Sequence, residues 1–219
     1  MRERHTRHIR RWMIAASAAL IASAGAGPAF GDDDDGRMTL RSATFEDGAT
    51  LPLSMIGTIP GGCTANGATG GNTSPQLTWR HAPDETRSFV VIVYDVVAQF
   101  THWAMYNIPA STTSLPENAG IPGSGFGVQN GNDFFIAGYN GPCPPTTATP
   151  LVHKYVVTVY ALDTRLPIVP TFGDFVPAGP EGLYRELIDN EHHGDHRRTH
   201  VLASASITGF YSAAAPAGN

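Results

Sequence analysis

One segment of the sequence, Ser88–Asp95, restricts the fold more than any other. Its residues from Phe89 to Tyr94 are all apolar or aromatic, and most of them are β-branched. A continuous run of this kind predicts a β-strand that is buried on both of its faces. Weaker strand patterns follow one another along the rest of the chain, at 39–45, 74–79, 102–108, 155–162 and 203–211.

Glycine and proline separate these segments, with 24 and 17 residues respectively in a chain of 219. This content predicts many turns, and the glycine-rich stretch 57–71 is typical of a long loop. Only 181–190 has a helical pattern, with Leu183, Leu187 and Ile188 on one stripe. No internal repeat or second hydrophobic block is present. The sequence therefore predicts one mainly β domain over 38–212, a β-sandwich with one or two peripheral helices.

The first 26 residues have the pattern of a secretory signal peptide. A basic start that ends at Arg10-Arg11 precedes an apolar run over 12–24, and small residues follow as cleavage sites. The run is too short to span a bilayer, so we expect export to the periplasm or medium of a bacterium, without stable membrane insertion after cleavage. An N-terminal anchor is the alternative. Residues 27–37 are expected to form an acidic linker and 213–219 a flexible tail.

Removal of that segment changes the charge and the expected state of the two cysteines. The whole chain has a net charge of -5, but residues 1–26 carry five arginines and one glutamate, so the remainder stands at -9. An acidic domain without a basic patch is not expected to bind nucleic acid. In an oxidising compartment Cys63 and Cys143 are expected to form a disulfide, with two buried thiols as the alternative.

Three segments bring polar residues to predicted strand ends, where binding sites usually form. Asp95 closes the long apolar strand, His102 opens the next one, and a stiff loop over 138–145 leads to His153 and Tyr155. Two imidazoles and a phenol can donate hydrogen bonds to a small anion, while a carboxylate can orient one of the rings. A plain packing role for the same side chains is the alternative.

The order of several motifs resembles one family. The motifs are Ser74-Pro-Gln-Leu-Thr-Trp79, Asp95-Val-Val-Ala-Gln-Phe-Thr-His102-Trp103, Gly138-Tyr-Asn-Gly-Pro-Cys-Pro-Pro145, His153-Lys-Tyr155, Val159-Tyr-Ala-Leu-Asp163 and Gly209-Phe-Tyr211. Over roughly residues 38–212 they resemble the phosphatidylethanolamine-binding protein family, in its bacterial Raf-kinase-inhibitor-like branch. The resemblance implies an antiparallel Greek-key β-sandwich with a small anion pocket, no cofactor and no catalytic chemistry.

The resemblance also assigns the pocket residues. Those that match the family are Asp95, His102, Pro144, Pro145, His153 and Tyr155. The chain departs from the family's Asp-Pro-Asp-x-Pro motif, since Val96, Val97 and Gln99 replace its two prolines and second aspartate. The loss of one carboxylate and both prolines is expected to loosen this loop. It leaves open whether the pocket still accepts a phosphate or a phosphorylated head group.

Three other functions compete with that of a non-enzymatic binding protein. A hydrolase would use Ser124 with His102, but the sequence around Ser124 lacks the strand-turn-helix pattern of a nucleophile elbow. A metal site could use the four histidines at 192, 193, 196 and 200, yet Gly194 interrupts the helical spacing and no metal is expected. The third class is an inhibitor-like module that binds a protein partner through its surface, with a vestigial pocket.

Overall fold

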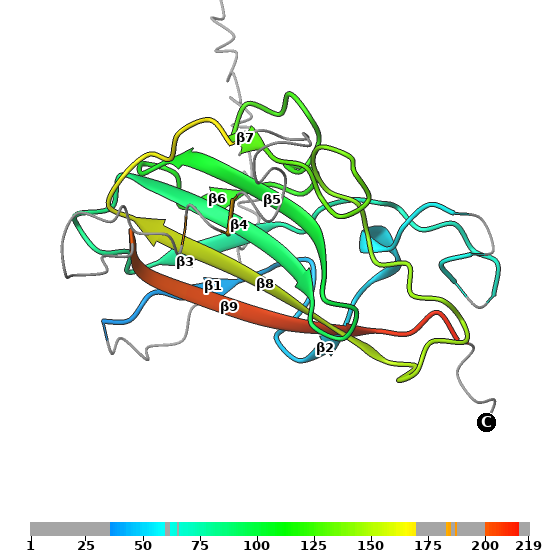
Figure 1. The fold of residues 1–219 in the computed structure, drawn as a ribbon. Coiled ribbons are helices and arrows are strands. Elements are labelled where there is room, and N and C mark those ends of the chain that lie inside the picture. Colours follow the sequence, from blue (N-terminus) through cyan, green and yellow to red (C-terminus); the bar gives the residue numbers. More distant parts are fainter. Residues whose placement is uncertain are drawn as a thin grey trace, which may run out of the picture.

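Two β-sheets form the framework of the computed structural model, which describes residues 36–59, 62–64, 66–169, 183, 184, 187 and 200–214. The larger sheet contains, in spatial order, β2 (Ala49–Thr50), β9 (Val201–Tyr211), β8 (His153–Leu162), β4 (Ser88–Asp95), β5 (Phe100–Pro109) and β7 (Val128–Gln129). The smaller contains β1 (Thr39–Arg41), β3 (Leu77–Arg80) and β6 (Ser114–Leu115). Figure 1 shows the long strands of the larger sheet side by side. The mainly β prediction is confirmed.

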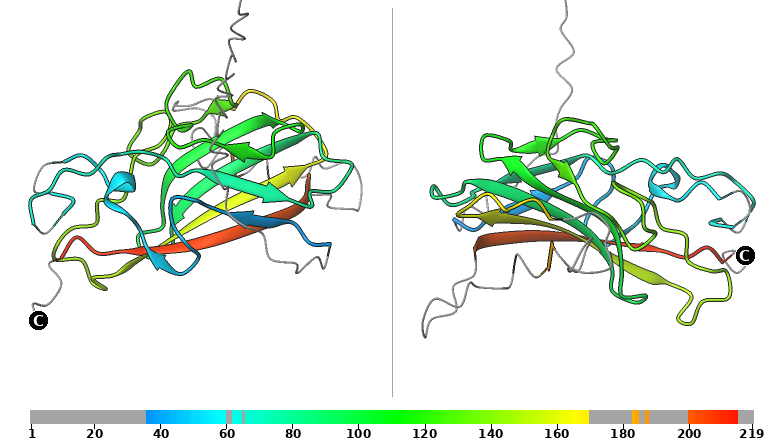
Figure 2. Two further views of the ribbon diagram at one scale, coloured as in Figure 1. Left: turned by 180° about the vertical axis from the view of Figure 1, so that it is seen from behind. Right: turned by 45° about the horizontal axis from the view of Figure 1, so that its top comes forward.

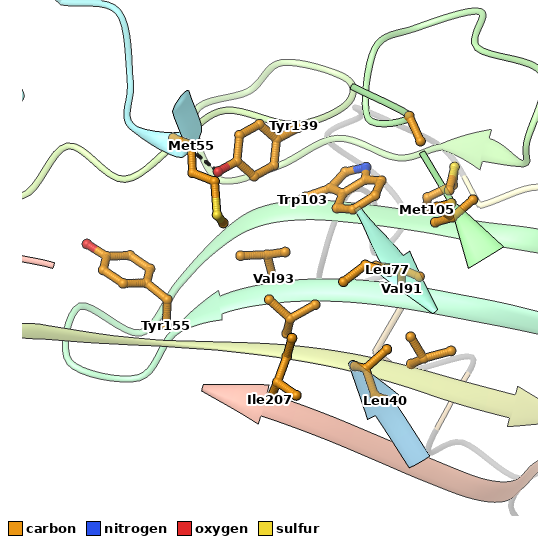
Figure 3. Packing of buried hydrophobic residues seen from close by; sticks show 14 of the residues in the cluster. Leu40, Met55, Leu77, Val91, Val93, Trp103, Met105, Tyr139, Tyr155 and Ile207 are labelled. Carbon is orange, nitrogen blue, oxygen red and sulfur yellow. Dashed lines mark hydrogen bonds between the residues drawn. The ribbon is translucent and has the colours of Figure 1, made fainter. Parts of the chain in front are cut away.

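The core lies between the two sheets, which cross face to face in the view from behind (Figure 2). From β4, the residues Phe89, Val91 and Val93 point into this core. They meet Leu40 and Leu77 of the smaller sheet, as Figure 3 shows for Val91 and Val93. The alternation of side chains along a strand thus places the odd-numbered residues of β4 inside the sandwich.

The even-numbered residues of β4 explain why its apolar run has no polar gaps. Val90 and Ile92 face the opposite side of the larger sheet, where Leu183 and Leu187 cover them in a second buried cluster. Leu183, Tyr184 and Leu187 have helical backbone, which agrees with the helix predicted over 181–190, and Ile188 lies outside the described residues. A strand covered on both faces is the structure that a continuous apolar run predicts.

Several predicted boundaries were wrong, and side chains explain the clearest case. The strand predicted over 39–45 ends at Arg41. Beyond that point Gln76 replaces the strand ladder, because its backbone carbonyl accepts from Ser42 Oγ at 2.6 Å and its Oε1 accepts from the Ala43 N–H at 2.8 Å. A 3-10 helix at Leu53–Met55 was not expected. All strand pairs are antiparallel, as predicted, except β2 with β9, which is parallel.

The predicted terminal segments are only partly described. The signal peptide, most of the acidic linker and the end of the tail, at residues 1–35 and 215–219, lie outside the described residues. Among the residues that are described, no helix has the length and apolar character needed to cross a bilayer.

Candidate functional site

Asp95 lies at the end of β4 and is almost completely buried, with 2% of its surface exposed. Its Oδ1 accepts hydrogen bonds from the backbone N–H groups of Val97 at 2.9 Å and Ala98 at 3.0 Å. An aspartate that binds the N–H groups just after it forms a turn, which here starts the connection to β5. The carboxylate therefore both fixes the loop and leaves Oδ2 for another partner.

That partner is His153, the first residue of β8. Its Nδ1 donates to Asp95 Oδ2 at 2.7 Å, and the imidazole is buried. The pairing of Asp95 with Tyr155 in the β4–β8 ladder puts all three side chains on the inner face of the sheet. Because Nδ1 is engaged by the carboxylate, Nε2 is the nitrogen of His153 that remains to meet a ligand.

A β-bulge brings His102 to the same place. Thr101 and Trp103 on β5 pair with consecutive residues of β4, so His102 between them is the extra residue of the bulge. Bulges redirect side chains beside functional sites. The ring nitrogen Nδ1 of His102 donates to the backbone carbonyl of Asn140 at 2.7 Å. Burial lowers the pKa of His102 below its usual value, while this carbonyl and the charge of Asp95 partly offset the effect.

The lowered pKa predicts a pH dependence of stability. Above pH ~6.5 His102 is neutral in both the folded and the unfolded chain. As the pH falls below that value, His102 is protonated in the unfolded chain but stays neutral in the folded protein. The free energy of unfolding therefore decreases by up to about 1.4 kcal/mol per pH unit. Urea unfolding between pH 5 and 8 should show a flatter profile for His102→Gln. An unchanged profile would contradict the assignment.

Tyr155 lies between the two imidazoles. Its ring centroid is 5.4 Å from that of His102, edge to face, and 6.4 Å from that of His153, stacked. Its hydroxyl is buried and has no hydrogen-bond partner with acceptable geometry among the described residues. Burial and the negative charge of Asp95 both raise the pKa of this phenol. The phenol therefore keeps its proton and can donate it to the nearby Asp95 carboxylate or to a ligand.

Three bonds hold the wall that carries Asn140 to the segment 55–63. The disulfide between Cys63 and Cys143 is present, as predicted, and joins the 57–71 loop to the 138–145 loop. The Gly57 N–H donates to the Pro142 carbonyl at 2.9 Å. In addition, Tyr139 Oη donates to the carbonyl of Met55 at 2.7 Å, the dashed line in Figure 3. These bonds fix the backbone on which the orientation of His102 depends.

The two predicted pocket prolines belong to this wall but not to the cluster of rings. Pro144 is buried and Pro145 is exposed. The hydrogen bonds and ring contacts that unite Asp95, His102, His153 and Tyr155 include neither proline. The structure thus brings together four of the six predicted side chains, and a ligand contact of the prolines stays a prediction.

The altered motif after Asp95 has a different backbone and not only different side chains. Gln99, at the position of the motif's final proline, has φ of +54°. The ring of proline holds φ near -65°, so proline does not fit this conformation. Val96 is 42% exposed, where the motif has its first proline. Proline at position 99 would not fit this turn, and Asp95 binds two of its N–H groups, while the expected loosening of the loop stays a prediction.

Three contributors to the site were missed by sequence reasoning. Phe100 and Phe134 lie edge to face at 4.6 Å, and both rings contact His102, at 5.2 and 5.5 Å. They shield the imidazole from water and account for its burial. The third is the carbonyl of Asn140, for which no sequence signal exists because every residue has a carbonyl. Phe134 did have a signal, the Phe134-Phe135 sequence in a polar loop.

The competing enzyme and metal interpretations receive no added support. Ser124 lies in the loop before β7, where its Oγ is 3.4 Å from Gln129 Nε2. Of the four histidines considered for a metal, only His200 is described, and its Nδ1 donates to Asp163 Oδ1 at 2.9 Å. Within the described part of the chain, no three potential ligands among His, Cys, Asp and Glu gather as a metal site would need.

Comparison with known proteins gives a consistent result. Residues 41–212 match the family model described as phosphatidylethanolamine-binding protein. A UPF0098 protein of Methanothermobacter thermautotrophicus is 34% identical over 80% of this chain and 98% of its own length. The UPF0098 protein YbcL of Escherichia coli is 44% identical over 47% of this chain and 60% of its own.

Two solved structures extend this likeness to the fold. The crystal structure of Escherichia coli YbcL, described as a new member of the mammalian PEBP family, superposes with a TM-score of 0.63 at 32% identity. It covers 80% of this chain and 98% of its own. A phosphatidylethanolamine-binding protein homologue from Chlamydia trachomatis gives a TM-score of 0.56 at 28% identity, with 81% and 98% covered.

Proposed function

Because this chain belongs to the phosphatidylethanolamine-binding protein family, we propose that it is an exported, non-enzymatic protein that binds a small anion. The ligand is inorganic phosphate or a phosphorylated head group, and it is held by the cluster of Asp95, His102, His153 and Tyr155. The proposal includes cleavage of residues 1–26, which their pattern and the disulfide support. N-terminal sequencing of the exported protein tests that part.

The observation that carries the proposal is the pair of buried imidazoles of fixed orientation, with the ring of Tyr155 in contact with both. Asn140 and Asp95 engage the Nδ1 atoms of the two rings, so both Nε2 atoms are left for a ligand. The O–H of Tyr155 can donate, and each Nε2 donates only when its ring is protonated, because Nδ1 holds the proton of the neutral ring. In the protonated form these groups suit the oxygens of a tetrahedral anion. Neighbouring aromatic rings keep water away and strengthen each hydrogen bond.

Charge sets the condition under which the anion binds. The carboxylate of Asp95 is paired with His153, and Asp133 also acts on His102 electrostatically. A neutral His102 therefore leaves the cluster without a net positive charge. Anion binding is favoured when His102 takes up a proton, and its lowered pKa confines this protonation to a more acidic pH than for an ordinary histidine. Affinity should rise as the pH falls, by up to about tenfold per unit for one proton taken up.

The test is an NMR titration of the histidine resonances with phosphate, phosphoethanolamine and sulfate at several pH values. Sulfate does not titrate in this range and isolates the protonation of the protein. We expect His102 and His153 to respond, and His102→Gln to weaken sulfate binding about tenfold or more, the loss of one charge-assisted hydrogen bond. His200→Gln is the control, because His200 pairs with an aspartate, as His153 does, but lies outside the cluster.

An absence of response at both buried histidines would reject the anion site and favour the second candidate, a module that binds a protein through its surface. Exposed apolar side chains near the cluster favour that candidate. Val96 and Val152 are 42% and 53% exposed, and Phe135 reaches 83% in a left-handed backbone conformation with φ of +59°. Strained, exposed aromatic residues are found at interaction sites more often than by chance.

A further inference from the structure

A second unfilled binding feature lies on β9, away from the histidine cluster. One side of β9 pairs with β8 over its whole length, whereas the other side pairs with β2 only at Gly209 and Phe210. Along Leu202–Ile207 no described strand pairs with that second side. These residues, Leu-Ala-Ser-Ala-Ser-Ile, include no charge and no proline. They therefore lack the charges and prolines by which many proteins protect an edge strand, and the irregularity of the ladder is confined to Leu202.

The hydrogen bonds of Thr208 show which backbone groups face this open edge. The Thr208 carbonyl accepts from the Gly48 N–H at 2.7 Å, and the Thr208 N–H donates to Asp47 Oδ1 at 2.7 Å. Both groups thus point away from β8. In an antiparallel ladder the direction repeats every second residue, and the register from 203 to 208 is regular. The N–H and C=O groups of Ser204 and Ser206 consequently point outward as well.

A groove runs beside this edge. Its volume is about 710 Å³, within the range of ligand sites. Ala205 and Ile207 of β9 line one wall, and Leu40 of β1 with Phe45 lines the other. Leu40 and Ile207 also belong to the buried core between the sheets, so the groove ends against that core. Both β1 and the free part of β9 are at the margins of their sheets, so the groove is the open side of the sandwich.

We propose that an extended peptide segment of another protein binds in this groove as an added antiparallel strand on β9. The backbone groups of Ser204 and Ser206 would bond to it, and alternate apolar side chains would lie against Phe45 and Ile207. This function is independent of the anion site. The groove has a wall on either side, so it has room for one extended chain. A second folded copy would have to bring its whole sheet into the same space.

Charge defines the peptide further. Glu46 and Asp47 are exposed at the end of the groove nearest Thr208, and Arg41, the one basic residue among the described lining residues, already has a partner. A basic residue near one end of the peptide would complement the two carboxylates. The same carboxylates disfavour a second copy of this acidic chain.

The probe is a synthetic acetylated and amidated peptide, Lys-Val-Thr-Val-Thr-Val, about as long as the free edge. Its addition to the isotope-labelled protein should shift the amide resonances of Ser204 and Ser206 and slow their hydrogen exchange. The amides of Ala203 and Ala205, which point toward β8, should keep their exchange rates. Two further peptides carry N-methyl groups on alternate residues, in the odd or the even positions. One of the two should bind at least tenfold more weakly, since only one set of N–H groups faces β9.

The protein-side variant is Ser206→Pro, which removes the outward N–H without removing a bond to β8. Its matched control is Ser206→Ala, because both changes remove the Ser206 Oγ contact with Thr158 Oγ1 at 2.8 Å. Proline should weaken binding about tenfold and alanine should leave it unchanged. If the proline variant does not fold, the N-methylated peptides decide alone. Four results would each overturn the proposal. They are equal binding of the two N-methylated peptides, no response at millimolar peptide, shifts confined to other strands, and self-association of the free protein through β9.

Discussion

Replacement of Cys63 and Cys143 by serine is expected to lower the free energy of unfolding by about 4 kcal/mol. The two cysteines are 80 residues apart, and a cross-link over such a loop stabilises mainly by restricting the unfolded chain. For a domain of this size the melting temperature should fall by about 10 °C. Chemical and thermal unfolding of the double variant measure both quantities.

The reduced wild-type protein is the control for this experiment, since it lacks the cross-link but keeps both sulfur atoms. It should unfold with the double variant and not with the oxidised protein. The loss should also reach His102, because Cys143 belongs to the loop whose Asn140 carbonyl holds that imidazole. A difference below about 1 kcal/mol between oxidised and reduced protein would contradict this account of the disulfide.

The second large effect is expected for Asp95→Ala, which should cost about 3 to 5 kcal/mol. The change leaves the N–H groups of Val97 and Ala98 without their acceptor and leaves a buried His153 without its partner. Breaking a buried pair from one side is costly because the remaining polar groups cannot turn to water. Denaturant unfolding at pH 7 measures the loss.

The chain provides a matched control for the same chemistry at the surface. Asp163 accepts from His200 at 2.9 Å, close to the 2.7 Å of Asp95 and His153, but its side chain is 47% exposed. Asp163→Ala should therefore cost no more than about 0.5 kcal/mol. Asp95→Asn should recover part of the loss, since an amide oxygen can still accept from the turn. Equal effects of the two alanine substitutions would show that burial does not set the strength of the pair.

Much of this arrangement could be predicted from the sequence. The apolar run of β4 has the predicted limits Ser88 and Asp95, and its lack of polar gaps correctly indicated cover on both faces. The prediction that Asp95, His102, His153 and Tyr155 gather relied on their positions at strand ends. The register of β4 and β8 places Asp95 directly opposite Tyr155, and the role of these residues in binding stays a prediction. Periodicity and strand ends are local features, which a sequence displays directly.

What could not be predicted depends on contacts between distant segments. The bulge that turns His102 toward the site depends on how β5 pairs with β4, and the sequence of β5 has no pattern that predicts it. The early end of β1 depends on Gln76, more than thirty residues away. The left-handed conformation of Gln99 has no local signal either, because glutamine seldom adopts it.

The ladder between β4 and β8 has a consequence for how such a site can change. Its rungs run without interruption from Ser88 opposite Leu162 to Asp95 opposite Tyr155. A slip of a single rung would set Lys154 opposite Asp95 and turn His153 and Tyr155 to the other side of the sheet. The site therefore depends on the exact register of β4 against β8. Loops other than the turn after Asp95 and the 138–145 loop can vary in length, but an insertion or deletion of one residue inside either strand would erase it.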